Sequence, residues 1–363
     1  MTSPKSIACI GGGINGVMSA WALARAGCQV TLFERGALMS ETSSASTKLL
    51  HGGLRYLENY KFSLVRESLR ERAWWIQQAP HLAKPIRLLL PLYKGVSRSR
   101  FLIQMGLGLY DFLSGDTNFG KHSWLSLERL RKEAPSIQTT HLKGAFAFFD
   151  AQMDDRALGL WAAEQAKAAG VQIREHTEVL RITQDARVQT SDQELHFDGI
   201  LNVAGPWCRK LLDASDIPAK HNLDLVRGSH LLVDRPLKNG FFLQVPNEKR
   251  IGFVLPYQGK IMIGTTEVRQ SLSDPIACSL EEELYLRELF NHYFADKLSA
   301  TDRVETFSGL RPLVDDGSGD PMKTSREFVF EQQGKVLSVF GGKWTTARVL
   351  GEKAKTLMLK AIA

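Results

Sequence analysis

Hydrophobic and polar positions over the first 35 residues follow the order strand, turn, helix, strand. The apolar run at 6–10 predicts a buried strand, and the glycine cluster at 11–16 predicts a turn. Residues 17–27 have the pattern of a helix that ends at Gly27, and the run at 28–35 predicts a second strand. Together these segments predict a βαβ unit at the start of the chain.

Later regions extend this pattern. Residues 197–207, FDGILNVAGPW, predict a strand that ends in a backbone turn at 204–206. Residues 335–363 predict a strand, a double-glycine turn and a closing helix. Between 221 and 306, short apolar runs such as HLLVD, FFLQV and KIMIGTTE alternate with turn residues, which predicts an antiparallel sheet.

Composition adds size and charge to this picture. The chain has 363 residues, of which 44% are hydrophobic and 23% charged, so it is long enough for two folded domains. Its formal net charge of +7 favours anionic partners, namely a phosphorylated substrate, an acidic membrane surface or nucleic acid. The basic residues form no tail or continuous run, which argues against nucleic acid. The four cysteines lie far apart, so neither a disulfide framework nor a metal site is indicated.

The glycine turn of the βαβ unit indicates a dinucleotide. Gly11, Gly13 and Gly16 match G-x-G-x-x-G, a pattern that permits a tight turn, close approach of a pyrophosphate and close packing of helix on strand. The helix that follows presents its N-terminus to the phosphates. Glu34 ends the second strand, where a carboxylate would accept hydrogen bonds from the ribose hydroxyls.

The segment after Glu34 favours a flavin over a nicotinamide. A nicotinamide dehydrogenase would continue with further strand and helix units, whereas residues 42–47 are rich in serine and threonine and precede Gly52 and Gly53. Hydroxyl groups would serve the pyrophosphate and ribityl chain of an extended FAD, and glycines would allow the backbone to touch the flavin ring. A solvated loop is the alternative interpretation of such a polar run.

These motifs resemble those of FAD-dependent glycerol-3-phosphate dehydrogenases, in the D-amino-acid-oxidase-like flavoprotein superfamily. The glycine motif and NVAGPW are widespread in that superfamily and indicate FAD alone. The stretches STKLLHGGLRYLE, GLRPL and SRE are specific to the glycerol-3-phosphate group. Matching stretches run from end to end of the chain, and larger members continue with a further helical domain that this sequence lacks.

The resemblance implies an α/β fold in which a Rossmann-like FAD-binding domain carries an inserted substrate domain built on the antiparallel sheet. We expect the FAD-binding domain to comprise residues 1–74, 144–220 and 307–363. The substrate-binding cap domain would comprise residues 75–143 and 221–306.

The residues expected to bind FAD come from the glycine motif, the hydroxyl segment and the later turns. They are Gly11, Gly13, Gly16, Glu34, Arg35, Thr42, Ser43, Ser46, Thr47, Leu50, Gly52, Gly53, Ala204, Gly205, Trp207, Gly309, Arg311, Gly342, Lys343, Trp344 and Thr345.

The prediction of a phosphorylated substrate depends on arginines. A phosphate monoester has nearly two negative charges, and a planar guanidinium grips its oxygens in a way that lysine does not. Arg55, Arg311 and Arg326 stand where the family places its phosphate- and hydroxyl-binding arginines. Tyr56 is expected to orient the substrate beside them. For each arginine the alternative is a surface side chain that covers apolar area.

Proton removal needs a base, and His230 is the leading candidate because imidazole titrates near neutral pH. A buried histidine that satisfies a core hydrogen bond is the alternative. His51 is expected to contact the flavin edge, and Lys343 to polarise the flavin and the developing ketone; Arg55 and Arg311 complete the catalytic set. The acids in DAQMDD, 150–155, are interpreted as loop or helix-cap residues, because carboxylates would repel a phosphate.

The family activity is oxidation of sn-glycerol 3-phosphate to dihydroxyacetone phosphate by hydride transfer to FAD, with electrons passed to a quinone. Two small departures from the family pattern are Lys48 in place of an arginine and Trp344 in place of a smaller residue. Three alternatives stay open: an oxidase that uses O₂, an enzyme for another hydroxy or amino acid, and a non-catalytic FAD-binding protein.

The N-terminus lacks the pattern of a secretory signal, so we expect a cytoplasmic protein. The apolar segment 101–113 is too short to span a bilayer and is interrupted by Gln104 and Asp111. A core helix is the favoured interpretation. The alternative is a helix lying on an anionic membrane, with peripheral attachment to the cytoplasmic face of the inner membrane, because basic residues precede it.

Overall fold

The N-terminal βαβ unit lies at the centre of a six-stranded sheet with the order β18-β19-β11-β1-β2-β7. Helix α1 (Ile14–Arg25) connects β1 (Ser6–Ile10) to β2 (Gln29–Phe33), as predicted. All neighbouring strands are parallel except β18, which runs antiparallel to β19. The remaining strands are β7 (Gln172–Arg174), β11 (Gly199–Asn202), β18 (Phe328–Gln333) and β19 (Val336–Gly341).

Both faces of this sheet are buried, which explains the continuous apolar run of β1. Ile7 and Cys9 belong to a core shared with α1, α5 (Asp155–Ala168) and α8 (Ala347–Ala361). Ala8 and Ile10 belong to a second core on the opposite face. That core is completed by α6 (Cys208–Ala214) and by a three-stranded sheet of β8 (Val179–Ile182), β9 (Arg187–Thr190) and β10 (Glu194–His196).

A larger sheet forms the other part of the molecule, with ten strands among the described residues. Its main order is β16-β12-β15-β14-β13-β4-β6-β3, with β17 paired to β12 and β5 paired to β6. Its pairs are antiparallel as predicted, except that β13 and β4 are parallel. The bounds are β3 (Leu49–Leu50), β4 (Ala83–Tyr93), β5 (Ser123–Leu125), β6 (Leu142–Met153), β12 (Leu223–Val233), β13 (Gly240–Gln244), β14 (Ile251–Tyr257), β15 (Lys260–Gly264), β16 (Val268–Arg269) and β17 (Val304–Val314).

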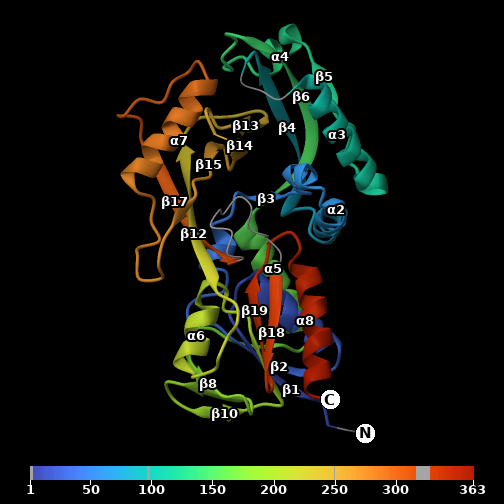
Figure 1. Ribbon diagram of the computed structural model, residues 1–363, viewed down its shortest axis with the longest axis vertical. Coiled ribbons are helices and arrows are strands. Elements are labelled where there is room, and N and C mark those ends of the chain that lie inside the picture. Colours follow the sequence, from blue (N-terminus) through green and yellow to red (C-terminus); the bar gives the residue numbers. More distant parts are fainter. Residues whose placement is uncertain (1–2, 96–98, 249, 316–327) are drawn as a thin grey trace.

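Helices cover the two faces of the larger sheet. Alternate strand residues point to opposite faces, so neighbours such as Leu88 and Leu89 enter different cores. One core includes α4 (Leu127–Glu133) and α7 (Leu280–Tyr293), and the other includes α2 (Phe62–Gln78) and α3 (Arg100–Ser114). Figure 1 shows α3 and α7 on opposite sides of this part of the molecule.

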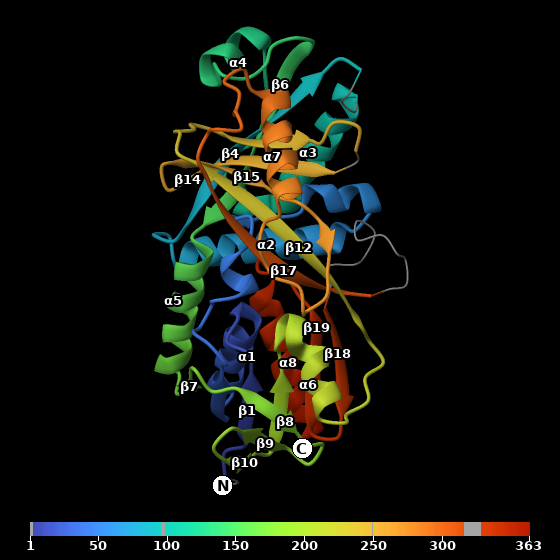
Figure 2. The same ribbon diagram turned by 90° about the vertical axis from the view of Figure 1, so that its left-hand side faces the viewer.

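The two sheets are joined by strands that extend from one part toward the other. Figure 2 shows the long strands β12 and β17 running diagonally from the larger sheet toward the smaller one. The predicted domain boundaries at 143/144 and 306/307 fall inside β6 and β17, which pair only within the larger sheet among the described residues. We therefore propose the same two-unit division with all of β6 and β17 counted in the cap.

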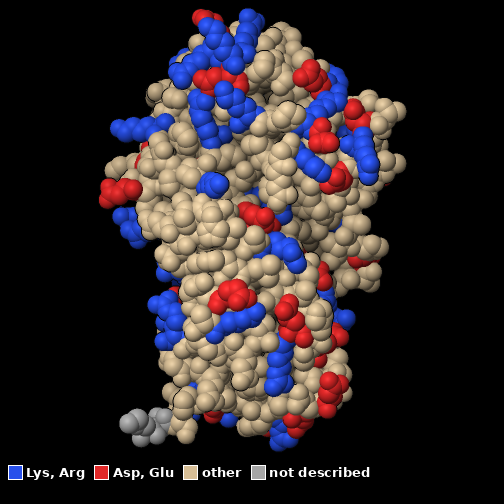
Figure 3. All heavy atoms as spheres, turned by 180° about the vertical axis from the view of Figure 1, so that it is seen from behind, with Lys and Arg blue, Asp and Glu red and all other residues tan. Residues whose placement is uncertain are grey.

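The computed structural model describes residues 3–95, 99–248, 250–315 and 328–363. Within these ranges, no helix is both long and apolar enough to cross a membrane. On the face shown in Figure 3, acidic and basic side chains are interspersed, and lysines and arginines gather at the end that carries α4. That face therefore presents no continuous basic stripe of the kind that tracks a nucleic acid backbone.

Candidate functional site

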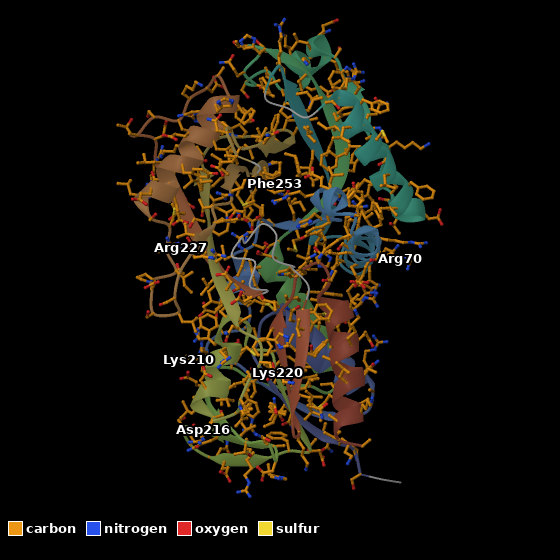
Figure 4. The ribbon with its side chains drawn as sticks, in the orientation of Figure 1. Arg70, Lys210, Asp216, Lys220, Arg227 and Phe253 are labelled. Carbon is orange, nitrogen blue, oxygen red and sulfur yellow. The ribbon has the colours of Figure 1, made fainter. Side chains whose placement is uncertain are left out.

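A cavity of about 630 Å³ lies between the two sheets and is lined by residues from both. The carboxyl ends of the parallel strands open into it, at positions such as Gly11, Glu34 and Val203. Figure 4 marks both parts of its wall, with Lys210 of α6 below and Phe253 of β14 above. Open α/β sheets bind ligands at the carboxyl ends of their strands, so the cavity is the candidate site.

Most residues predicted to bind FAD line this cavity. They are Gly11, Gly13, Glu34, Arg35, Thr42, Ser43, Ser46, Thr47, Gly53, Ala204, Gly205, Trp207, Gly309, Arg311, Gly342, Lys343, Trp344 and Thr345. The predicted substrate residues Arg55, Tyr56 and His230 line it too. Arg326 lies outside the described residues.

Gly16, Leu50 and Gly52 do not line the cavity, and each has a packing role instead. A Cβ on Gly16 would lie 1.9 Å from the Gly11 carbonyl oxygen, so this glycine lets α1 approach the turn. The Leu50 side chain is fully buried in the core under α1. A Cβ on Gly52 would lie 2.4 Å from both Leu69 and the Tyr110 hydroxyl, so the glycine lets these two residues pack closely. Its contact with the flavin edge stays a prediction.

The hydroxyl segment is held in place by its own side chains. Ser43 Oγ accepts a hydrogen bond from the Ile14 N–H at the start of α1, at 3.0 Å. Thr42 Oγ1 donates to the Leu310 carbonyl at 2.7 Å, which fastens the segment to β17. These hydroxyls were predicted to serve FAD, and the structure shows that they also fix the shape of the loop.

A buried ion pair anchors the end of the same segment. Lys48 Nζ lies 2.7 Å from Asp155 Oδ1, and their side chains are only 7% and 0% exposed. Lys48 also donates to the Ser44 carbonyl at 2.7 Å, and Ser46 Oγ donates to Asp155 Oδ2 at 2.7 Å. Lys48, which stands where the resemblance leads us to expect an arginine, therefore holds this loop in place from its buried side.

The acids of DAQMDD have three different roles. Asp154 is the N-cap of α5, where its side chain accepts from the Ala157 N–H, as predicted for a helix-cap residue. The interpretation was incomplete for the other two. Asp155 forms the ion pair with Lys48, and Asp150 is buried on β6, where it accepts hydrogen bonds from Arg72 and from the Gly52 N–H. Asp155 does not line the cavity and is neutralised by Lys48, whereas Asp150 lines the cavity with its charge offset by the ion pair with Arg72.

Several lysine and arginine side chains line the cavity. Among them are Arg55, Lys61, Arg311 and Lys343. Lys343 Nζ lies 4.1 Å from the centre of the Tyr56 ring, close enough for a cation–π interaction. Arg311 donates to the Thr266 carbonyl at 2.8 Å, which fixes its guanidinium at the cavity wall. With Arg35 and Lys210, six lysines and arginines of the described residues line this pocket, which favours an anionic ligand.

His230 lies on β12 with its ring stacked on Phe307 of β17, at a centroid distance of 4.7 Å. Its Nε2 is 3.0 Å from Thr47 Oγ1, and its Nδ1 has no hydrogen-bond partner among the described residues. Burial lowers the pKa of His230 from 6.5 to about 3, and the nearby charges of Arg311 and Lys48 act in the same direction. The predicted base is thus neutral at physiological pH, with less basicity than an ordinary histidine.

Sequence reasoning missed several residues of the cavity wall. Thr177, Glu178 and Val179 come from the loop before β8 and the start of that strand, and Phe253 and Glu267 come from the larger sheet and the segment after β15. Their local sequence has the ordinary pattern of strands and turns. Only the pairing of distant strands brings them to the site.

Comparison with known proteins identifies the family. The family model described as FAD dependent oxidoreductase matches residues 6–352. This chain belongs to the FAD dependent oxidoreductase family. It is 37% identical over 96% of its length to a glycerol-3-phosphate dehydrogenase of Pseudomonas aeruginosa, and spans 70% of that protein. It is also 37% identical over 95% of its length to D-erythritol 1-phosphate dehydrogenase of Brucella abortus, and spans 71% of it.

A solved structure of similar fold is that of glycerol-3-phosphate dehydrogenase from Bacillus halodurans complexed with FAD. The TM-score is 0.79 at 25% identity, and the match covers 99% of this chain and 65% of that one. The predicted resemblance and the predicted cofactor, FAD, are therefore confirmed.

The cavity of this FAD dependent oxidoreductase has donors and acceptors that fit FAD. The first turn of α1 lines it at Ile14 and Asn15, where the helix dipole favours a pyrophosphate. Glu34 is held by the Gly12 and Gly36 N–H groups at 2.6 and 2.8 Å, and its carboxylate keeps further lone pairs for ribose hydroxyls. Asn15 Oδ1 is buried without a partner among the described residues, as expected for an acceptor that a ligand satisfies.

Trp344 connects the cavity wall to the hydroxyl segment. Its indole Nε1 donates to the Ser43 carbonyl at 2.9 Å, and its ring lies 5.0 Å from that of the buried Trp75. Trp344, where the family pattern has a smaller residue, therefore supports the loop that lines the cofactor site.

Replacing Trp344 with phenylalanine is expected to weaken FAD binding about 3- to 10-fold, because one hydrogen bond of about 0.5–1.5 kcal/mol to the loop is lost while the ring contact is kept. The FAD dissociation constant, measured by titrating apoprotein and following flavin fluorescence, checks this. Trp124→Phe is the matched control, since Trp124 packs against Phe146 and does not line the cavity. Equal affinity in the Trp344 variant and the wild type would contradict the expected role.

Proposed function

We propose that this chain oxidises the secondary hydroxyl of glycerol 3-phosphate to the ketone of dihydroxyacetone phosphate. The observation that carries the proposal is that several cations, including Arg55, Lys61, Arg311 and Lys343, line one cavity. A small phosphate monoester is the ligand class that suits several convergent cations in a pocket of this size. The name of the Pseudomonas aeruginosa relative supports the same substrate.

FAD, when bound, supplies the two-electron acceptor for this oxidation. The protein binds the phosphate, orients the alcohol carbon and excludes water from it. In our proposal Arg55 and Lys61 neutralise the phosphate, and Tyr56, held beside Lys343, orients the substrate. Arg326, which lies outside the described residues, stays a predicted substrate residue.

The hydroxyl proton is assigned to His230 in this proposal. With Nε2–H donating to Thr47, Nδ1 is the ring nitrogen left to accept a hydrogen bond from the substrate. Burial lowers the pKa of His230 to about 3, and the charges of Arg311 and Lys48 act in the same direction. A bound phosphate dianion would offset these positive charges and raise the basicity of the ring as substrate enters. His51, which also lines the cavity, is the second candidate for a contact with the reacting group.

Anaerobic mixing tests the proposal. Glycerol 3-phosphate should bleach the absorbance of the bound flavin, whereas glycerol without phosphate should not. Release of hydrogen peroxide on admission of air would identify an oxidase instead of a dehydrogenase that transfers electrons to a quinone. Absence of bleaching with any phosphorylated polyol would leave a non-catalytic FAD-binding protein and overturn the proposed activity.

A membrane surface is the second partner that we propose, through α3. Phe101, Met105 and Phe112 lie at positions i, i+4 and i+11 of this helix and are 72%, 57% and 79% exposed. On the opposite side of α3, Leu107 and Tyr110 are buried. The prediction of a core helix therefore explains this buried face of α3, but it does not explain the exposed apolar face. An exposed apolar stripe suits shallow insertion into the cytoplasmic face of the inner membrane.

The double variant Phe101→Ser and Phe112→Ser is expected to reduce binding to vesicles at least about tenfold, because two large apolar side chains no longer enter the lipid. Sedimentation of the holoprotein with vesicles of phosphatidylglycerol and phosphatidylethanolamine measures this. Leu280→Ser with Leu284→Ser is the matched control on α7, because these two leucines of α7 are also exposed. If both double variants bind equally well, α3 is not the membrane contact.

A further inference from the structure

A carboxylate, Glu267, lies in the wall of the same cavity that the lysines and arginines line. Its side chain is 12% exposed and lies between two arginines. Glu267 Oε1 is 3.5 Å from Arg311 Nη1, and Glu267 Oε2 is 3.5 Å from Arg250 Nε. An acid inside a pocket for an anionic ligand would repel that ligand, so its position needs a chemical reason.

The two arginines also hold the backbone beside Glu267. Arg250 donates to the Thr265 carbonyl at 2.8 Å, and Arg311 donates to the Thr266 carbonyl at 2.8 Å. Residues 265–267 are therefore held from two sides by guanidinium groups, and the Glu267 carboxylate is fixed against Arg311 rather than free to turn away. Arg311 thus faces the cavity as half of an ion pair, with its positive charge offset by a neighbouring acid.

An arginine paired with a carboxylate offers a ligand both donors and acceptors. A hydroxyl group matches this pair, because it accepts from a guanidinium N–H and donates its own hydrogen to a carboxylate oxygen. A substrate carboxylate matches it poorly, because it has no hydrogen to donate and carries the same charge as Glu267. The Arg311–Glu267 pair is thus suited to the neutral, hydroxyl-bearing end of a polyol phosphate.

We propose that Glu267 is a specificity residue that admits the terminal hydroxyl of a polyol phosphate beside Arg311 and rejects a carboxylate at that end. The inference rests on the proposed function and defines its substrate class: polyol phosphates are accepted, and the corresponding phosphorylated hydroxy acids are refused. It also orients the substrate, with the phosphate directed to the side of Arg55 and Lys61 and the polyol end to the side of Arg311.

Two ligands that differ only at the terminal group test the inference. Glycerol 3-phosphate ends in a CH₂OH group, and glycerate 3-phosphate of the same configuration at the secondary carbon ends in a carboxylate. The test variant is Glu267→Gln, which keeps the size and one hydrogen-bond acceptor of the side chain and removes its charge. Glu248→Gln is the matched control, because Glu248 also lies near Arg250, at 3.6 Å, but does not line the cavity.

In the wild-type holoprotein we expect the inhibition constant of glycerate 3-phosphate to exceed the KM of glycerol 3-phosphate. In Glu267→Gln the inhibition constant should fall at least about tenfold relative to that KM, because the repulsion between two nearby negative charges is removed. The FAD content should not change, and Glu248→Gln should behave as the wild type. An equal change for both ligands, or no change for either, would overturn the inference.

The rise in the Tm of the holoprotein on ligand binding measures affinity without catalytic turnover. Glycerate 3-phosphate should raise the Tm of Glu267→Gln more than that of the wild type, and an equal rise in both proteins would again count against the inference. Failure of glycerol 3-phosphate to bleach the flavin of the wild type would overturn the proposed function, while this comparison would still decide whether Glu267 excludes carboxylates.

Discussion

An Arg311→Ala variant is expected to bind glycerol 3-phosphate at least about 100-fold more weakly than the wild type. Arg311 lines the cavity from β17, and its guanidinium is fixed by the Thr266 carbonyl at 2.8 Å. A hydrogen bond between a charged donor and the substrate contributes about 1.5–3 kcal/mol, which is lost in the variant. The loss of affinity is increased because Glu267, which lies 3.5 Å from Arg311, is then no longer neutralised by that arginine and repels an anionic ligand.

The measurement is KM for glycerol 3-phosphate together with the FAD dissociation constant of the same preparation. The FAD dissociation constant should change far less than KM, since the predicted phosphate and ribose contacts of FAD lie at Gly13 and Glu34. Arg269→Ala is the matched control, because Arg269 is ion-paired with Asp224 outside the cavity and is 48% exposed. A parallel loss of substrate and FAD affinity would show that Arg311 supports the whole site rather than the substrate.

The second large effect is expected in the acid stability of the protein, through His230. Burial and two nearby cations lower the pKa of His230 to about 3 in the folded protein, against 6.5 for an ordinary histidine. Between these pH values the unfolded chain binds a proton at this residue and the folded chain does not. The free energy of unfolding therefore falls as the pH falls, by about 1.4 kcal/mol per pH unit and on the order of 5 kcal/mol in all.

Replacing His230 with asparagine should remove this contribution. We expect the variant to be less stable than the wild type at pH 7, because the ring contact with Phe307 is lost, yet to lose less stability between pH 6.5 and pH 4. Urea unfolding at several pH values measures both effects. His196→Asn is the matched control, since His196 is exposed on β10. The same pH dependence in the wild type and the His230 variant would contradict the assignment.

The local sequence pattern was sufficient to predict the secondary structure that forms the cofactor end of the site. The strand, glycine turn and helix of residues 6–25 follow from apolar periodicity and from the spacing of Gly11, Gly13 and Gly16. Such features are encoded by neighbouring residues, so one sequence reveals them. The family resemblance, confirmed by the comparisons, then predicted the cofactor and most of the cavity wall.

Contacts between distant residues add roles that the local pattern does not predict. Gly52 is predicted to contact the flavin edge beside Gly53, and the structure shows in addition that its missing side chain makes room for Leu69 and Tyr110. The serine and threonine hydroxyls are predicted to serve the cofactor, and several of them also bind Asp155, Ile14 and Leu310. A polar side chain bonds to whichever donor or acceptor the fold brings near, and that neighbour is not adjacent in sequence.

The sequence by itself determined the strand and helix types, the glycine-dependent turn and the identity of the residues available for chemistry. Only the tertiary structure decided that Lys48 neutralises Asp155, that His230 is buried against Phe307, and that Glu267 lies against Arg311. Propensity and periodicity act over a few neighbouring residues, whereas charge pairing and burial depend on the distances between strands that are far apart in the chain.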